Sequence, residues 1–417
     1  MRKNVMVFAD WEGLAGPIKI GELHCIPVRG KEVFSFEYDK GWINSGKFHL
    51  LDPDLKLLTG PQYPGDDKTN FGFFLDSSPD RWGRLLMNRR EAYIARKEGR
   101  KPKPLLESDY LLGVNDILRM GGLRLKTEES GQFLNDDQNL VIPPISRLRE
   151  LEEASHKLEK DDSLNDPNYS AWLNLLLAPG SSIGGARPKA NVADLKKELW
   201  IAKFPARSDV FDTGGWEMVV WELAKLSGLS VPESRVELFS PRGHTFLSKR
   251  FDRTQNGERI HFASAMTLLG YTDGTDFKDG ASYLEMAEFL LQNGSNVGND
   301  LEEVWRRIVF NICTKNTDDH LRNHGFLLTD KGWKLSPAYD LNPNPLGTGL
   351  TLNISLTDNS LDLELAMEVR SFFRLTDQKA SDIIMQVKKE VKNWKRIAEN
   401  MGIPRHEQEL MSQAFND

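Results

Sequence analysis

Cysteine is scarce in this sequence of 417 residues, since Cys25 and Cys313 are the only two and no C-x-x-C pair occurs. A disulfide framework and a zinc site built on thiolates are therefore excluded, and the cysteine content suits a reducing compartment. Long apolar runs are also lacking. The longest, Ala171 to Ala178, is interrupted by Asn174 and is far too short to span a membrane.

An apolar targeting segment is lacking at the N-terminus, because M-R-K-N-V-M-V-F-A-D-W mixes charged and apolar residues too closely. We therefore expect a cytoplasmic protein with no membrane partner.

Excess positive charge is lacking as well. The net charge of −7 argues against non-specific binding of nucleic acid, although it leaves room for a local basic face. The length allows two or three domains, each with a sizeable core.

Strand and helix patterns are mixed along the chain without regular strand–helix–strand alternation, which predicts an α+β fold. Short stretches with turn residues between them predict strands near residues 5–10, 17–23 and 33–39. Ser78 followed by Pro79 predicts a helix start, with the serine as the cap and the proline in the first helical position. One face of that helix is expected to carry Trp82, Leu85, Leu86 and Tyr93.

Three later elements have clear signals. Residues 216–227 are predicted to form a helix that is capped by Asp212 or Thr213. Apolar residues between Leu301 and Ile312 recur at i, i+3, i+4 and i+7, which predicts another helix. Residues 325–336 predict a hairpin with a D-K-G turn.

A polar stretch, T-K-N-T-D-D-H-L-R-N-H, lies between that helix and the hairpin. It places Asp318 and Asn323 five residues apart, and Asp340 follows the hairpin. In protein kinases an aspartate accepts the proton of the attacking hydroxyl, while an asparagine five residues later and an aspartate on a following loop hold Mg²⁺. The alternative is a polar turn that caps the preceding helix. We expect Asp319 and His324 to form the turn itself.

Two upstream segments could contact phosphate groups. P-G-S-S-I-G-G-A-R-P-K, residues 179–189, has small residues that allow close approach of the backbone, but it is neither a Walker A motif nor G-x-G-x-x-G, and a flexible loop is the alternative. Lys203 in W-I-A-K-F-P is placed like the lysine that holds ATP phosphates in kinases, with Glu217 as its partner on the next helix. Its alternative is a lysine at a sheet edge whose ammonium reaches solvent.

The strand F-L-S-K-R-F-D-R, residues 246–253, could form the connector that meets adenine, or equally a surface strand with a salt bridge. Each of these signals is modest alone, but their order is informative. A glycine-rich loop, a strand lysine, a helix glutamate, a connector, an Asp…Asn pair and a second aspartate follow one another as they do in a kinase fold.

Five segments together resemble the HipA-type serine/threonine kinases, the toxins of HipBA toxin–antitoxin modules. They are S-S-I-G-G-A-R-P-K, W-I-A-K-F-P, K-R-F-D-R, N-T-D-D-H-L-R-N and S-P-A-Y-D-L. An N-terminal segment, F-F-L-D-S-S-P-D-R-W-G-R, also looks like the small N-terminal subdomain of that family. The resemblance implies a bilobal, protein-kinase-like α+β fold. It further implies a β-rich subdomain at 1–140, an ATP-binding lobe part at 141–252 and a helical catalytic lobe at 253–417.

The resemblance also implies roles for individual residues. Asp318 matches the catalytic base, His320 braces the loop, and Asn323 and Asp340 match the Mg²⁺ ligands. The residues implied to bind ATP are Ser182, Gly184, Gly185, Ala186, Lys189, Lys203, Lys249 and Phe251. Ser182 also matches the serine that family members autophosphorylate. Two features depart from the best-known member of the family. The loop reads G-A-R-P-K here and G-A-Q-E-K in that member, and Lys249 stands where that member has a glutamate.

The family further implies a protein substrate such as an aminoacyl-tRNA synthetase, and a helix-turn-helix antitoxin of the HipB type through which DNA is reached. Two alternatives stay open. One is a transcriptional co-repressor that acts with such an antitoxin, and the other is a kinase-fold phosphotransferase for small molecules. The basic run at residues 88–101 could touch DNA in such a complex, or it could be a solvated helix face.

Overall fold

The computed structural model describes residues 2–46, 49–134, 142–160, 166–177 and 185–415. The chain forms two compact units. Unit 1 comprises Met1–Ser208 with Asp252–Ala263, and unit 2 comprises Asp209–Phe251 with Ser264–Asp417. This division runs differently from the three parts expected at 1–140, 141–252 and 253–417, which stay a prediction.

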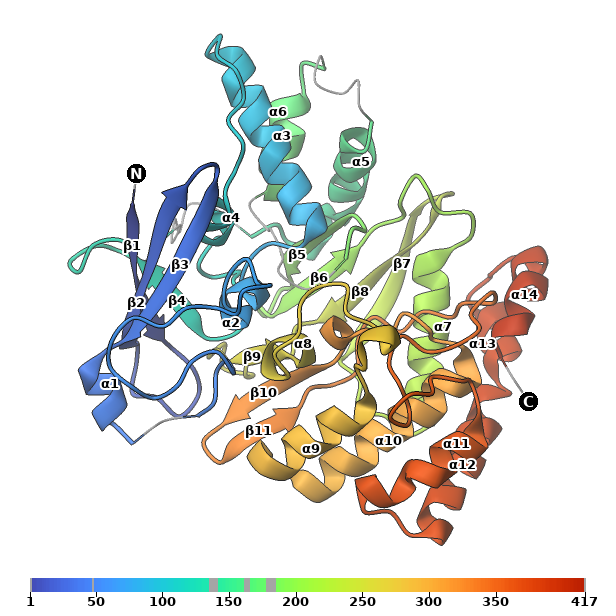
Figure 1. The fold of residues 1–417 in the computed structure, drawn as a ribbon. Helices are drawn as coiled ribbons and strands as arrows, with labels where there is room; N and C mark the ends of the chain where they lie inside the picture. The colour runs from blue at the N-terminus through green and yellow to red at the C-terminus, as the bar shows by residue number, and fades with distance from the viewer. Residues whose placement is uncertain (1, 47–48, 135–141, 161–165, 178–184, 416–417) are drawn as a thin grey trace. The chain divides into compact units, whose positions relative to one another are not determined.

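Unit 1 begins with a β-rich part and continues into helices (Figure 1). Its described elements, in chain order, are β1 (Lys3–Ala9), β2 (Ile18–Val28), β3 (Lys31–Tyr38), α1 (Lys40–Asn44), α2 (Gly72–Asp76), α3 (Arg81–Lys97), α4 (Glu107–Gly113), β4 (Leu123–Lys126), η1 (Ile145–Arg147), α5 (Leu148–Leu158), α6 (Tyr169–Leu177), β5 (Lys189–Ala193) and β6 (Leu199–Lys203). The short strand β9 (Phe262–Ser264) contains the last residues of unit 1 and the first of unit 2.

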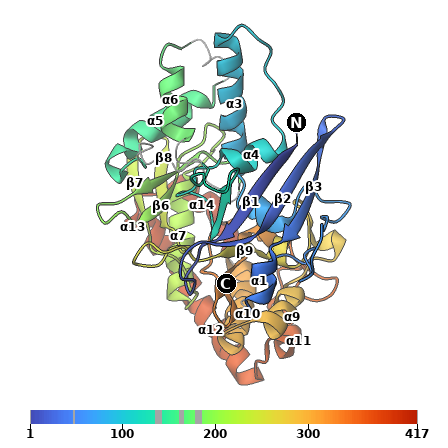
Figure 2. The same ribbon diagram turned by 90° about the vertical axis from the view of Figure 1, so that its left-hand side faces the viewer.

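The N-terminal strands form an antiparallel sheet in the order β3-β2-β1-β4. Strands β3, β2 and β1 are labelled in Figure 2. Side chains alternate across it, so that Val5, Val7 and Ala9 of β1 are fully buried. Phe36 of β3 packs edge-to-face against the phenylalanines of the segment that leads into α2 and of α2 itself, Phe71, Phe73 and Phe74. The three strands predicted here are confirmed.

Helix α3 starts two residues later than the sequence predicts. Asp80, and not Ser78, is its N-cap, because the Asp80 carboxylate accepts a hydrogen bond from the Gly83 amide at 2.8 Å. Trp82 and Leu86 are buried as expected, but Leu85 is 40% exposed and lies off the packed face. Helix α6 packs against α3 and α5, as Figures 1 and 2 show.

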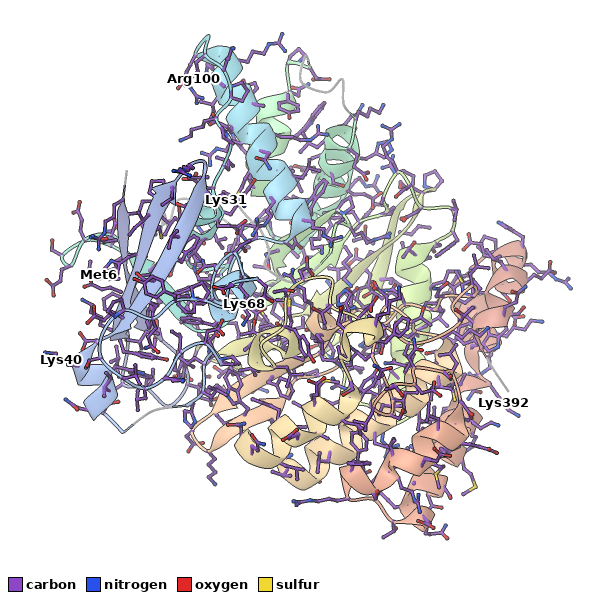
Figure 3. All side chains as sticks on the ribbon, viewed as in Figure 1. Met6, Lys31, Lys40, Lys68, Arg100 and Lys392 are labelled. Carbon is purple, nitrogen blue, oxygen red and sulfur yellow. The ribbon has the colours of Figure 1, made fainter. Side chains whose placement is uncertain are left out.

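The basic run at residues 88–101 forms the second half of α3 and the turn after it. Part of its charge is neutralised within the run. Arg100, which is labelled in Figure 3, lies just past the end of α3. It pairs with Glu91 at 2.5 Å and with Glu98 at 2.6 Å. This pairing favours the interpretation of the run as a solvated helix face.

Unit 2 contains one antiparallel hairpin, a large helical part and a second hairpin. Its described elements are α7 (Thr213–Leu226), β7 (Ser234–Ser240), β8 (Gly243–Lys249), α8 (Ala265–Leu268), η3 (Phe277–Asp279), α9 (Tyr283–Asn293), α10 (Val297–Thr314), η4 (Leu321–Asn323), β10 (Gly325–Thr329), β11 (Gly332–Leu335), α11 (Leu363–Val369), η5 (Arg370–Phe373), α12 (Asp377–Val391), α13 (Trp394–Asn400), α14 (Arg405–Met411) and η6 (Ser412–Ala414).

The elements predicted in this unit are confirmed. Asp212 caps α7 by accepting from the Gly215 amide at 3.0 Å. The amphipathic helix is α10, whose apolar residues from Leu301 to Ile312 are buried against α9, α11 and α12. Strands β10 and β11 pair as the expected hairpin. Among the described residues, no helix combines the length and the apolar character needed to cross a membrane.

Candidate active site

The polar stretch predicted to be functional is the loop that joins α10 to β10. Lys315 ends α10 in a left-handed conformation, with a φ of 42°, and turns the chain out of the helix. Asn316 then ties the loop back to the helix, because its side-chain amide donates to the Asn311 side-chain oxygen at 3.0 Å. The loop, residues 315–324, is thus anchored on a rigid buried helix.

Asp318 and Asn323 both lie in this loop and are joined by a hydrogen bond from the Asn323 side chain to the Asp318 main chain. The Nδ2 of Asn323 donates to the carbonyl oxygen of Asp318 at 2.6 Å. Asn323 is buried, and its Oδ1 is a buried atom that has no hydrogen-bond partner among the residues that the structure describes. The side chain of Asp318 is 74% exposed. The loop therefore presents one accessible carboxylate beside one orphaned amide oxygen.

His320 stands between these two residues. Its Nε2 lies 3.7 Å from Oδ1 of Asp318, and its side chain is 36% exposed. Its Nδ1 is buried and has no hydrogen-bond partner in the part of the chain that the structure describes. The imidazole is thus close enough to influence the Asp318 carboxylate, and its expected role as a brace stays a prediction.

Asp340 follows the hairpin and is held beside the loop from both sides. Tyr339, which precedes it, donates its hydroxyl to the carbonyl oxygen of Arg322 at 2.7 Å. Asn342, which follows it, donates its backbone amide to Oδ1 of Asn316 at 3.2 Å. Asp340 itself has a φ of 59°, a left-handed conformation that aspartate and asparagine tolerate better than most residues. The structure therefore brings the segment of Asp340 to the loop that carries Asp318 and Asn323.

The predicted connector reaches the same place within unit 2. The ring of Phe251 lies 5.5 Å from that of Tyr339, tilted by 33°. Lys249 ends β8, and its ammonium lies 3.7 Å from the carboxylate of Glu233. The adenine-binding role of Phe251 and Lys249 stays a prediction.

Asp319, which we expected to form the turn, is a buried and hydrogen-bonded residue of the loop. It is 1% exposed, it accepts a hydrogen bond from the Tyr283 hydroxyl, and its other oxygen accepts from the Thr351 amide at 2.7 Å. Burial raises the pKa of its carboxyl from 3.8 to about 7. Asp319 therefore anchors the loop to the buried part of the protein, while Asp318 is exposed to solvent.

His324 is likewise buried, at 5% exposure, and its ring meets that of Tyr283 edge-on. Burial lowers the pKa of this imidazole to about 3, so the ring is neutral at physiological pH. Tyr283 also accepts a hydrogen bond from Asn311 at 2.9 Å. Asp319, His324, Tyr283 and Asn311 thus form a buried polar cluster. A local sequence pattern does not reveal it, because its members come from distant parts of the chain.

This cluster predicts a pH dependence of stability. The folded state holds the Asp319 proton up to about pH 7, whereas the unfolded chain releases it near pH 3.8, so its stabilising contribution is complete below about pH 4 and is lost as the pH rises toward 7. Asp319→Asn has no such proton. From about pH 4 to pH 8, the unfolding free energy of the wild type should fall by about 2–4 kcal/mol relative to this variant.

Urea unfolding of the two proteins across this pH range measures that difference. Asp330→Asn, in the exposed turn of the β10–β11 hairpin, is the matched control and should run parallel to the wild type. Parallel curves for Asp319→Asn as well would contradict the assignment.

The remaining predicted residues belong to unit 1 or lie outside the described part of the chain. Lys203 is the last residue of β6, and Lys189, the first of β5, lies directly opposite it in the antiparallel register. Gly185 and Ala186 lie before β5, whereas Ser182 and Gly184 fall outside the described residues. The expected pair of Lys203 with Glu217 joins residues of different units and stays a prediction.

The residues around Asp318 fit a hard divalent cation. Asn323 has its amide nitrogen engaged, so its Oδ1, which has no partner among the described residues, is the end that would serve a metal, and Asp340 would add a carboxylate. Mg²⁺ is usually held in proteins by one or two such groups together with phosphate oxygens and water. An orphaned buried oxygen costs free energy unless something binds it. A cation with a nucleotide would meet that need.

The C-terminal part of the chain, residues 181–395, matches the family model of the HipA-like C-terminal domain. This chain belongs to the HipA family. The family resemblance read from the motifs is thereby confirmed. The matched range contains the loop with Asp318, both predicted metal ligands and Lys203.

Two curated proteins show how far the likeness to known sequences extends. A Haemophilus influenzae protein provisionally named a kinase is 30% identical over 134 residues, which are 30% of this chain and 39% of that protein. The serine/threonine-protein kinase toxin HipA of Shewanella oneidensis is 25% identical over 191 residues, 39% of this chain and 43% of the toxin. The matched part thus spans about two fifths of the length of each relative.

A solved structure extends the likeness to the whole HipA fold. The Shewanella oneidensis complex of HipA, HipB and operator DNA matches with a TM-score of 0.67 at 18% identity, covering 98% of this chain and 94% of that one. The predicted α+β fold of the HipA kinase type is therefore confirmed.

Sequence reasoning missed several residues that hold this candidate site in place. Tyr283 and Thr351 hold Asp319, while Tyr339 and Asn342 flank Asp340. The Y-D pair was a usable signal for Tyr339. Tyr283 and Thr351 lie more than thirty residues from Asp319 on either side, and no spacing rule points to them.

Proposed function

We propose that this chain is an ATP- and Mg²⁺-dependent serine/threonine protein kinase of the HipA toxin type. The observation that carries the proposal is the state of Asn323. Its amide nitrogen donates to the Asp318 carbonyl, and its buried oxygen has no partner within the described part of the chain, while the Asp318 carboxylate is exposed. A kinase needs this arrangement, with a base open to a protein hydroxyl and a metal ligand immediately next to it.

The chain's own residues would act mainly by positioning and charge. Asp318 would orient a seryl or threonyl hydroxyl and accept its proton, while Asn323 and Asp340 would hold Mg²⁺. Lys203 and the backbone at Gly184 and Gly185 would hold the phosphates, and Phe251 would lie against adenine. ATP supplies the γ-phosphoryl group, whose bond to ADP breaks as one to the substrate oxygen forms. Charge neutralisation by fixed groups would supply much of the rate.

The substrate, partner and regulation are further parts of the proposal. The substrate would be a protein of translation, such as an aminoacyl-tRNA synthetase, and Ser182 would be a site of autophosphorylation. A helix-turn-helix antitoxin of the HipB type would bind the chain and connect it to DNA. The likeness of the whole fold to a HipA that was solved with HipB and operator DNA supports this partner.

A transfer assay tests the proposed function. The chain is incubated with γ-labelled ATP and Mg²⁺, once with a bacterial lysate freed of small molecules and once with choline and aminoglycosides. We expect label in protein bands, including the chain itself, and loss of that label on chelation of Mg²⁺. Label found only in small molecules would replace the protein kinase by a small-molecule phosphotransferase. A chain that binds antitoxin and DNA but transfers no label would be a co-repressor.

A further inference from the structure

A buried ion pair in unit 1 joins the N-terminal segment to the first strand of the HipA core. The ammonium of Lys189 lies 3.0 Å from Oδ2 of Asp80, and the two side chains are only 2% and 1% exposed. Breaking such a pair on one side leaves an uncompensated buried charge, which is strongly destabilising. The segment L-D-S-S-P-D-R-W around Asp80 has no other assigned role.

Asp80 is held rigidly on its own side of the pair. Its Oδ1 caps α3, and the two serines before it donate their hydroxyls to α2, Ser77 to the Phe73 carbonyl at 2.9 Å and Ser78 to the Phe74 carbonyl at 2.8 Å. The buried guanidinium of Arg119 donates to the Ser77 carbonyl at 2.9 Å. A carboxylate fixed in this way can impose a position on its partner.

Lys189 is held at its backbone as well as at its ammonium. Trp82 lies two residues after Asp80 in the same segment, and its indole nitrogen donates to the Lys189 carbonyl at 3.0 Å. Lys189 also faces Lys203 directly across the β5–β6 pair. Like charges in facing positions repel one another, so the Asp80 carboxylate offsets a repulsion next to the lysine that is proposed to bind ATP phosphates.

The ammonium of Lys189 also lies close to Gly185, at the end of the glycine-rich segment. A side-chain carbon built on Gly185 would lie 3.3 Å from Nζ of Lys189, and Gly185 has a φ of 96°, a conformation that favours glycine. The Pro188 carbonyl accepts from the Phe204 amide at 2.9 Å. The position of the described end of the segment, Gly185–Lys189, therefore depends on Lys189 and on the backbone contact with Phe204, which follows β6.

We propose that Asp80 is a positioning residue for nucleotide binding, acting through Lys189. It fixes the ammonium close to Gly185 and balances charge beside Lys203, so that the N-terminal segment sets the geometry of the phosphate-binding backbone. This inference rests on the proposed kinase function for its effect on ATP, whereas the ordering of residues 185–189 does not depend on it. It also changes the prediction for Lys189, whose ammonium would support the loop instead of reaching the phosphates.

The test separates the ion pair from the helix cap. Asp80→Asn keeps a good N-cap, because asparagine caps helices as well as aspartate does, but it removes the charge opposite Lys189. We expect the KM for ATP to rise about tenfold with kcat within about twofold, because the loop provides binding that is equal in the ground state and transition state. Amide hydrogen exchange at residues 185–189, measured without nucleotide, should become faster.

Asp116→Asn is the matched control. Asp116 is also buried in unit 1, and it pairs with Arg124 at 2.6 Å and with Arg259 at 3.0 Å. Its loss should lower stability without changing the KM for ATP or the exchange at residues 185–189. Equal behaviour of the Asp80 and Asp116 variants in both measurements would show that the Asp80 pair is structural only and would overturn the proposal.

The double variant Asp80→Asn, Lys189→Met completes a cycle. Since both charges are then gone, it should regain stability relative to Asp80→Asn, while its KM for ATP should match that of either single variant. Additive increases in KM would mean that the two residues act separately, which contradicts the proposal. If the wild type transfers no phosphoryl group, the proposed function fails, and the exchange measurements still decide whether Asp80 orders residues 185–189.

Discussion

An Asp318→Ala variant is expected to fold like the wild type and to lose phosphoryl transfer by about 10²- to 10⁴-fold. The side chain of Asp318 is mostly exposed, and the loop's internal hydrogen bond uses the Asp318 carbonyl oxygen, which alanine retains. The change in unfolding free energy should therefore stay below about 1 kcal/mol. Transfer of label from ATP to protein, together with thermal unfolding, measures both quantities.

The matched control for this experiment is Asp330→Ala, because Asp330 is an exposed aspartate in the turn of the next hairpin. It should leave transfer within about twofold of the wild type, as expected for a surface residue away from the site. Transfer that survives in Asp318→Ala would refute the assignment of the base. Loss of transfer together with a large loss of stability would show that Asp318 has a structural role instead.

Asp340→Asn is expected to lower transfer by about 10²- to 10³-fold, since a metal ion contributes several kcal/mol to charge stabilisation in such sites. Asparagine is the informative replacement. It tolerates the left-handed φ of 59° and keeps an oxygen that can accept from Asn342, whereas alanine would add backbone strain to the loss of the carboxylate.

A Mg²⁺ titration shows whether Asp340 is a ligand of the metal ion. The Asp340→Asn variant should need a higher Mg²⁺ concentration for half-maximal transfer and should bind ATP less tightly only when Mg²⁺ is present. Asp358→Asn, in an exposed turn of the same unit, serves as the control and should show the wild-type Mg²⁺ dependence. An unchanged Mg²⁺ dependence in Asp340→Asn would remove Asp340 from the metal site.

Sequence patterns were sufficient to locate those elements whose formation depends on residues close together along the chain. The 3.6-residue apolar period located α10, and the alternation and turn residues located β1–β3 and the β10–β11 hairpin. The start of α3 was misplaced because Ser78 and Asp80 are both good caps. Which of them faces the first turn depends on how the segment folds back toward Lys189 and α2.

The two aspartates of T-D-D-H show the limit of such patterns. They are neighbours with the same chemistry, yet Asp318 is mostly exposed and Asp319 is buried with a raised pKa. Burial and hydrogen bonding set this difference, and they come from Tyr283 and Thr351, far away along the chain. The same holds for His324, which the sequence placed in a turn and the fold places in a neutral buried cluster.

The amino-acid sequence by itself determined the kinds of groups available, their order along the chain and most of the elements that carry them, because residue chemistry, spacing and periodicity are properties of short segments. Only the tertiary structure decided which groups face solvent, which lose their water, and which distant segments meet. The orphaned oxygen of Asn323, the buried carboxyl of Asp319 and the Asp80–Lys189 pair all depend on contacts between such segments, and burial there multiplies the cost of any unpaired polar group.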